Sequence, residues 1–161
     1  MDDVTVSNLN EVIDDEGKYK TLLESTKAIP WKIDWETKQF SYIGPQIEEL
    51  LGWPQQSWLN ANDWIERIHS DDRERTANFC ISQSIDGTDH EADYRALKAD
   101  GSFVWIRDVV HVIRKNGVTT ELVGFMFDIS ERKRMEDELL SLNRKLEALS
   151  LQDGLDRKSV V

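Results

Sequence analysis

The chain has 161 residues, of which 39% are hydrophobic and 32% charged, a composition typical of one globular domain with short extensions. Its formal net charge of −11 argues against nucleic acid as a partner, because a phosphate backbone is met by clustered Lys and Arg. No stretch approaches the ~18 apolar residues that a membrane span needs, so we expect no direct membrane insertion. The single cysteine forms no internal disulfide, which favours a cytoplasmic location.

The first third of the sequence predicts a polar segment, a short helix and a hairpin. Residues 1–17 are rich in Asp and Glu and are expected to be a polar leader or an N-terminal helix. Apolar residues at helical spacing indicate a short helix within 18–27. Large apolar side chains then alternate with polar ones over 31–35 and 40–42, and residues 36–38 between them suit a turn. This pattern predicts a β-hairpin.

The middle of the chain is predicted to be helical. A first helix covers residues 47–51, and short helices over 58–68 are expected to be joined by a break at 60–62. Ser70 is a good N-cap and is followed by two Asp residues, which place negative charge against the positive end of a helix. We expect that helix to end at 86–87.

From His90 onward the pattern is that of strands. Residues 94–98, 103–114 and 118–129 are rich in β-branched and aromatic side chains. The Asn-Gly pair at 116–117 is the favoured signal for a two-residue hairpin turn, because both turn positions tolerate a positive φ. Two strands, several helices and three strands in this order predict an α+β fold with an antiparallel sheet covered by helices on one face.

A last helix is expected to begin with Ser130 as its cap. Its apolar residues recur at alternating spacings of four and three, which is the pattern of a heptad seam. Charged residues flank this seam, so we expect a dimeric coiled coil in preference to a helix packed on its own sheet. The predicted dimer seam consists of Met135, Leu139, Leu142, Leu146 and Leu149.

Six segments in a fixed order resemble the PAS family of sensory domains, over roughly residues 18–135. The segments are Ile-Pro-Trp-Lys-Ile-Asp at 29–34, Ile-Glu-Glu-Leu-Leu-Gly-Trp at 47–53, Arg-Ile-His-Ser-Asp-Asp-Arg at 67–73, Tyr-Arg at 94–95, Asp-Gly-Ser-Phe-Val-Trp-Ile at 100–106 and Gly-Phe-Met-Phe-Asp-Ile-Ser-Glu-Arg-Lys at 124–133. The resemblance implies a five-stranded antiparallel sheet with helices on one face, enclosing a pocket.

The same resemblance implies how the chain is divided into functional segments. It places a PAS sensory domain at 18–130 and a coiled-coil signalling helix at 131–150. In this family the step formed here by Asp128, Ile129 and Ser130 is the exit from the sheet, and we expect it to transmit a signal to the helix.

Residues 149–155 are similar to the entry segment of a GGDEF diguanylate cyclase domain, and the similarity stops after Leu155. Residues 151–161 are therefore expected to be the start of such an output domain or an unrelated tail. A histidine kinase is the alternative output, although residues 135–149 contain no His of the kind that those enzymes usually show in their dimerisation helix.

The sequence requires no cofactor, although haem and noncovalent flavin stay open. A haem PAS domain needs an axial His that faces the pocket. His69 precedes a helix cap, His90 begins a strand near a turn and is expected to be exposed, and the direction of His111 is not set by its neighbours. None of the three is favoured as a ligand, and no paired His/Cys spacing indicates a metal site.

Light-sensing flavin chemistry is disfavoured, because that branch of the family needs a reactive Cys in an Asn-Cys-Arg-Phe-Leu-Gln helix. Cys80 lies in a different context and in a later helix, where a small core residue is expected. The carboxylates Asp71, Asp72 and Glu74 cluster at a helix start, where capping accounts for them. No phosphate loop or nucleophile–base motif occurs. We expect a regulatory domain and not an enzyme.

The alternation of the last strand and its neighbours predicts which side chains line the pocket, although a solid core would use the same residue types. The favoured function is a homodimeric sensor that binds a small apolar or aromatic ligand and controls a covalently linked output domain. The alternative is a ligand-free dimerisation module. The predicted pocket residues are Leu50, Trp64, Ile106, Val110, Leu122, Gly124 and Met126.

Overall fold

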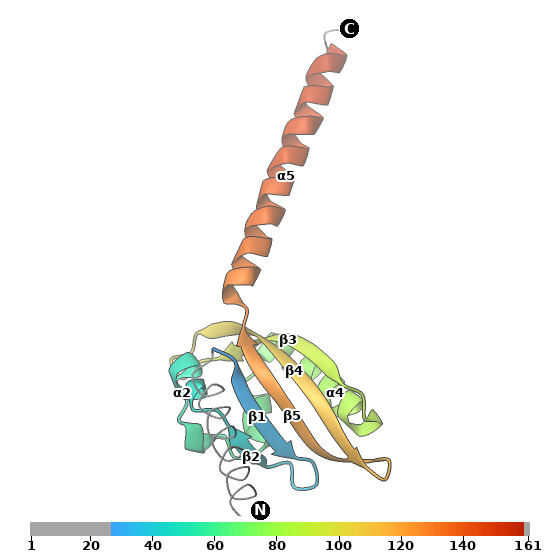
Figure 1. Cartoon of the computed structure of the whole chain (residues 1–161). Coiled ribbons are helices and arrows are strands. Elements are labelled where there is room, and N and C mark those ends of the chain that lie inside the picture. Colours follow the sequence, from blue (N-terminus) through green and yellow to red (C-terminus); the bar gives the residue numbers. More distant parts are fainter. Residues whose placement is uncertain (1–26, 160–161) are drawn as a thin grey trace, which may run out of the picture. The chain divides into compact units, whose positions relative to one another are not determined.

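The computed structural model describes residues 27–159, with side chains up to Leu151 (Figure 1). The leader predicted at 1–17 and the short helix expected after it lie outside the described residues. The chain divides into two compact units, one ending at Asp128 and one beginning at Ile129.

The first unit contains a five-stranded antiparallel sheet with helices on one face, as the sequence predicts. The strand order is β2-β1-β5-β4-β3, and the helices lie behind the sheet in the view of Figure 1. The elements are β1 (Ile29–Asp34), β2 (Phe40–Ile43), α2 (Gln46–Leu51), a 3-10 turn (Gln55–Ser57), α3 (Ala61–Glu66), α4 (Ser70–Asp86), β3 (His90–Leu97), β4 (Phe103–Lys115) and β5 (Val118–Asp128).

The register of the sheet determines which side chains face the helices. Trp31 on β1 pairs with Gly124 on β5, which pairs with Val110 on β4, which in turn pairs with His90 on β3. Directly opposed residues in an antiparallel sheet project to the same face. This row therefore crosses four strands on the inner, helix-covered face of the sheet.

The hairpin between β4 and β5 forms at the predicted place. Asn116 and Gly117 have φ values of 54° and 77°. Both residues thus adopt the left-handed conformation that a two-residue turn of this kind requires and that Asn and Gly tolerate.

The prediction of a break at 60–62 was wrong, because helix α3 begins there. Asn60 is the N-cap, and its side-chain oxygen accepts the amide of Asp63 at 3.1 Å while the Asp63 carboxylate accepts the amide of Asn60 at 3.0 Å. This reciprocal capping box starts a helix at Ala61. The Asn that suggested an interruption is the residue that begins the element.

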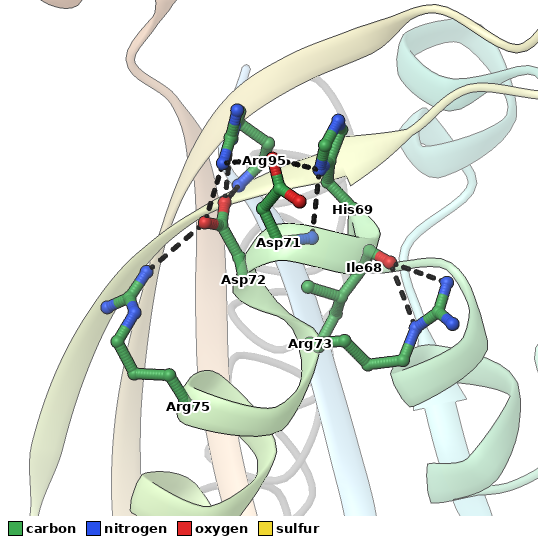
Figure 2. Close-up of polar contacts among 7 residues, drawn as sticks. All are labelled: Ile68, His69, Asp71, Asp72, Arg73, Arg75 and Arg95. Carbon is green, nitrogen blue, oxygen red and sulfur yellow. Dashed lines mark hydrogen bonds and ion pairs between the residues drawn. The ribbon is translucent and has the colours of Figure 1, made fainter.

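Helix α4 also starts differently from the prediction. His69 takes the cap position, with extended backbone angles, and its Nδ1 accepts the amide of Asp71 at 3.1 Å. Ser70, which we expected to cap, is the first helical residue. Figure 2 shows the His69 ring above this first turn.

A partly buried ion pair joins the start of α4 to strand β3. The Arg95 guanidinium donates to both carboxylate oxygens of Asp72 at 2.9 Å, and the Arg95 backbone amide donates to the same group (Figure 2). The Asp72 side chain is 7% exposed and that of Arg95 is 23% exposed. Hydrogen bonds from Arg95 hold the pKa of Asp72 well below its usual range, against the opposing effect of burial.

The second unit is the helix α5 (Ser130–Ser159), which is longer than the range 131–150 that we assigned to it. Its first backbone hydrogen bond runs from the amide of Lys133 to the carbonyl of Ile129 at 2.9 Å. Ile129 therefore occupies the cap position that we predicted for Ser130. No described helix combines the length and the hydropathy that crossing a lipid bilayer requires.

We predict that Asp72→Asn lowers the free energy of unfolding by about 3 kcal/mol, because it leaves the Arg95 guanidinium with only the exposed carboxylate of Asp71, at 3.8 Å, as its counter-charge. Urea unfolding followed by circular dichroism measures the change. The loss should be largest above pH 4 and should shrink at lower pH, because the native Asp72 carboxylate stabilises the fold only where the unfolded chain is also ionised.

Arg75→Gln is the matched control for this prediction. Arg75 contacts Asp72 at 3.5 Å, but its side chain is 65% exposed, so its removal should cost less than about 1 kcal/mol. Equal losses from the two variants would contradict the assignment of the stabilising pair to Arg95.

Candidate ligand cavity

A cavity of about 310 Å³ lies between the inner face of the sheet and helices α3 and α4. Its size suits a small molecule, since ligand sites are commonly of this order or larger. Carbon atoms make up nearly all of its accessible lining. The lining residues are Trp31, Ile33, Trp35, Lys38, Phe40, Ala61, Asn62, Trp64, Ile65, Cys80, Ile81, Ser84, His90, Asp108, Val110, Leu122 and Met126.

The cavity opens beside the β1–β2 hairpin. Three of its lining residues are exposed to solvent: Lys38 in the hairpin turn, Asn62 on α3 and Ile81 on α4. The ammonium group of Lys38 lies 3.7 Å from the centre of the Trp35 ring and also donates to the Trp35 carbonyl. These contacts hold the hairpin turn closed on itself at the mouth of the cavity.

Four of the seven predicted pocket residues line this cavity. Leu122 and Met126 reach it from β5, Val110 from β4 and Trp64 from α3. The first three of these lie on one face of the sheet. The structure therefore brings together side chains that are up to 62 positions apart in the sequence, from Trp64 to Met126.

The other three predicted residues do not line it. Leu50 packs partly buried against the core, and Ile106 is fully buried one step further along the sheet. Gly124 does lie on the inner face, but a Cβ built there would come within 2.6 Å of the Trp31 indole. The indole thus covers the glycine and takes its place in the cavity wall.

A buried carboxyl group on the inner face escaped the sequence analysis. Asp108 on β4 is 3% exposed; its Oδ1 accepts the Trp31 indole N–H at 2.9 Å and its Oδ2 accepts the Tyr94 hydroxyl at 3.0 Å. The Tyr94 oxygen in turn accepts the indole N–H of Trp64 at 2.9 Å. This chain of hydrogen bonds, the Asp108 network, joins β1, β4, β3 and α3. The sequence pattern that could have revealed Asp108 is its position in the strand, because it shares the alternation of Ile106 and Val110 and so lies on the same face.

Burial dominates the electrostatics of this network. It raises the pKa of the Asp108 carboxyl to about 7, although the hydrogen bonds from Tyr94 and Trp31 act in the opposite direction. Burial and the nearby Asp108 also raise the pKa of the Tyr94 hydroxyl well above its ordinary value. The same two causes raise the pKa of the Cys80 thiol to about 12, so Cys80 is a neutral lining residue and not a thiolate nucleophile.

The three histidines occupy different environments. His69 caps α4, and His111 is largely exposed with its Nδ1 at 2.9 Å from Asp89. His90, which we expected to be exposed, is buried at 8% exposure and lines the cavity. The correction follows from the register, because His90 opposes Val110 and so points inward. Within the described residues, no three metal-ligating side chains come together.

Comparison with protein families agrees with this architecture. A model of the PAS fold matches residues 40–126, which is more than half of the chain. The chain belongs to the PAS family. The matched residues contain α2, α3, α4 and most of the sheet, and so include most of the walls of the cavity.

A solved structure, the N-terminal domain of a diguanylate cyclase with a PAS/PAC sensor from Marinobacter aquaeolei, is 62% identical with a TM-score of 0.66. The match covers 66% of this chain and 99% of that one. Among curated proteins, the methyl sulfide methyltransferase-associated sensor of Methanosarcina acetivorans is 27% identical over 89% of this chain. The sensor protein FixL of Bradyrhizobium diazoefficiens is 24% identical over 84%. This chain spans only 15% and 27% of the lengths of these two curated relatives.

We predict that the stability of this PAS domain falls as the pH rises from about 4 to about 7. In that window the native Asp108 holds a proton that the same aspartate in the unfolded chain, whose pKa has the ordinary value of 3.8, has released. The slope attributable to this group is at most about 1.4 kcal/mol per pH unit. Above pH 7 the decrease in stability that is due to Asp108 should level off.

Asp108→Asn tests this prediction, because an amide keeps the shape of the side chain but does not titrate. The difference in the free energy of unfolding between this variant and the wild type, measured in urea from pH 4.5 to 8.5, should shift in favour of the variant as the pH rises. A difference that is the same at every pH would show that Asp108 does not titrate in this window.

Proposed function

We propose that this chain is the sensory input of a longer, homodimeric signalling protein. A small apolar or aromatic molecule binds in the cavity and changes the conformation of the sheet. This change biases the arrangement of two paired α5 helices. These helices control a covalently linked output domain, a GGDEF diguanylate cyclase. A ligand can shift such a two-state equilibrium only by its difference in affinity for the two states.

The observation that carries this proposal is the continuity between the cavity wall and the outgoing helix. Leu122 and Met126 line the cavity from β5, and one residue, Ile129, separates β5 from α5. A change in the strand that accompanies ligand binding therefore has a covalent path of a few residues, through Asp128, Ile129 and Ser130, to the helix.

The exposed seam of α5 supports pairing with a second copy. Every member of the predicted seam is at least half exposed, from 50% at Met135 to 60% at Leu139. Large apolar side chains repeated at heptad spacing are buried when two helices pair as a coiled coil. The remaining seam residues, Leu142, Leu146 and Leu149, are 53%, 56% and 58% exposed.

The assignment of the output domain has two supports. Residues 149–155 are similar to the entry of a GGDEF domain. The solved domain that is 62% identical belongs to a diguanylate cyclase. A helical connection from the sheet toward the output is provided by α5.

If a ligand binds in the cavity, we predict that Ile81→Trp displaces it or lowers its affinity. Ile81 lines the mouth from α4 and is 41% exposed, so an indole there can occupy the opening without overpacking the core. Native mass spectrometry of the purified wild type should show a bound molecule. The Ile81→Trp protein should retain less than about a tenth of that occupancy.

Ile85→Trp provides the control, because Ile85 lies on the same helix, is 63% exposed and does not line the cavity. It should bind as the wild type does. A wild-type protein that carries no molecule, and binds none in a screen of small apolar and aromatic compounds, would refute ligand sensing and leave a dimerisation module.

The paired-helix arrangement predicts that changing Leu139 and Leu142 together to Lys gives a monomer. Each helix would bring two ammonium groups into the seam, four in the dimer, and their burial costs far more than two short heptads contribute. Sedimentation velocity should show the wild type at the mass of a dimer and the variant at half that mass.

Leu140→Lys is the control, since Leu140 is 54% exposed and lies off the heptad seam. This variant should remain dimeric. If the doubly substituted protein sediments as a dimer, α5 does not pair through the predicted seam.

A further inference from the structure

The inner wall of the cavity contains one imidazole ring that the proposed function does not use. His90 begins β3, opposes Val110 and lines the cavity, and its side chain faces helix α4. The Phe79 ring on α4 meets the His90 ring edge-on at 5.7 Å between centroids. Both the sheet and the helix therefore restrict how the imidazole can turn.

The hydrogen bonds of His90 define its tautomer. Its Nδ1 lies 2.9 Å from the carbonyl oxygen of Thr88. A carbonyl can only accept, so the Nδ1 must carry the proton. In the neutral ring the Nε2 is then a hydrogen-bond acceptor.

That Nε2 atom is buried and has no hydrogen-bond partner among the described residues. A buried polar atom without a partner is costly, by about 1–3 kcal/mol, and is rare in folded proteins. A binding partner that enters the cavity and donates a hydrogen bond would remove this cost.

Three other polar side chains around the cavity already have partners. Both oxygens of Asp108 accept hydrogen bonds within the Asp108 network. The Ser84 hydroxyl donates to the Cys80 carbonyl at 2.6 Å, and the Asn62 amide donates to Glu66 at 3.1 Å. Among these inner groups, the Nε2 of His90 is the one without a partner. Less than 1 Å² of this atom is accessible, so a ligand that reaches it must displace the atoms that cover it.

Two further features constrain the ligand. The cavity presents almost only carbon, and the indoles of Trp31 from β1 and Trp64 from α3 are part of its lining, which favours a flat apolar ring. Above its pKa of about 7, the buried Asp108 carboxyl is ionised and opposes an anionic group in the interior. A charged ligand would also lose its hydration without gaining a counter-charge.

We propose that the cavity binds a small uncharged aromatic molecule with one N–H or O–H group, and that this group donates a hydrogen bond to the Nε2 of His90. This inference rests on the proposed function, because it takes the cavity to be the ligand site. It adds the chemical class of the ligand and the residue that selects it.

Indole and benzofuran test the inference, since they share a shape and differ in the N–H group. Calorimetric titration of the purified chain at pH 8, where a free imidazole is neutral, should show indole binding about tenfold tighter than benzofuran. In His90→Phe, which keeps a ring and removes the acceptor, the two affinities should become equal.

His111→Phe is the matched control, because His111 is exposed and paired with Asp89 outside the cavity. It should keep the preference for indole. A second measurement needs no substitution at His90: in nitrogen NMR of the wild type, the Nε2 resonance of His90 should move on addition of indole and not on addition of benzofuran.

Four results would overturn the inference. Benzofuran could bind the wild type as tightly as indole, His90→Phe could keep the preference, or neither compound could bind. A haem absorption band that disappears in His90→Phe would also overturn it, by assigning the Nε2 to iron. If mass spectrometry then finds a ligand of another class that Ile81→Trp displaces, the proposed sensing function stands although this ligand class does not.

Discussion

The carboxyl group of Asp108 is the centre on which the inner face of this PAS domain depends. It is almost wholly buried, and it accepts one hydrogen bond from Trp31 on β1 and another from Tyr94 on β3. Tyr94 extends the connection to Trp64 on α3. Because a buried carboxyl without partners is strongly unfavourable, these donors hold their side chains in fixed positions. The indoles of Trp31 and Trp64, which both line the cavity, are among them.

The cavity therefore owes its shape to two sets of directional polar contacts. The Asp108 network orients the walls that come from the sheet and from α3. The pair of Asp72 and Arg95 ties the start of α4, which forms another wall, to β3. Apolar contact alone is not directional and would allow these elements to close on the empty space. Directional contacts at both places keep about 310 Å³ open within a small domain.

The sequence predicted the parts of this structure that local chemistry determines. The Asn116-Gly117 turn, the alternation of β5 and the order of strands and helices all depend on neighbouring residues. The inward direction of Asp108 and His90 depends on how β4 registers with β3 and β5, and a single strand does not reveal that.

The sequence was limited in a similar way in predicting which residues line the cavity. Ile106 and Gly124 lie on the predicted face, but the fully buried core surrounds one and the Trp31 indole covers the other. Which inward side chain borders an open space depends on the sizes of its neighbours in three dimensions. The caps of α3 and α4 were missed because Asn60 and His69 are also common in loops, where the same atoms make different bonds.

The fit of Trp31 over Gly124 has a consequence for how this domain can diverge. A Cβ at position 124 would clash with the backbone carbonyl oxygen of Val109 as well as lie 2.6 Å from the indole, and a smaller residue at position 31 would leave one oxygen of Asp108 without its donor. The backbone contact requires glycine at 124 even where the indole is lost. Among descendants of a common ancestor, the glycine should therefore be kept whether or not the tryptophan is, whereas tryptophan at 31 and an acceptor at 108 should be inherited or lost together.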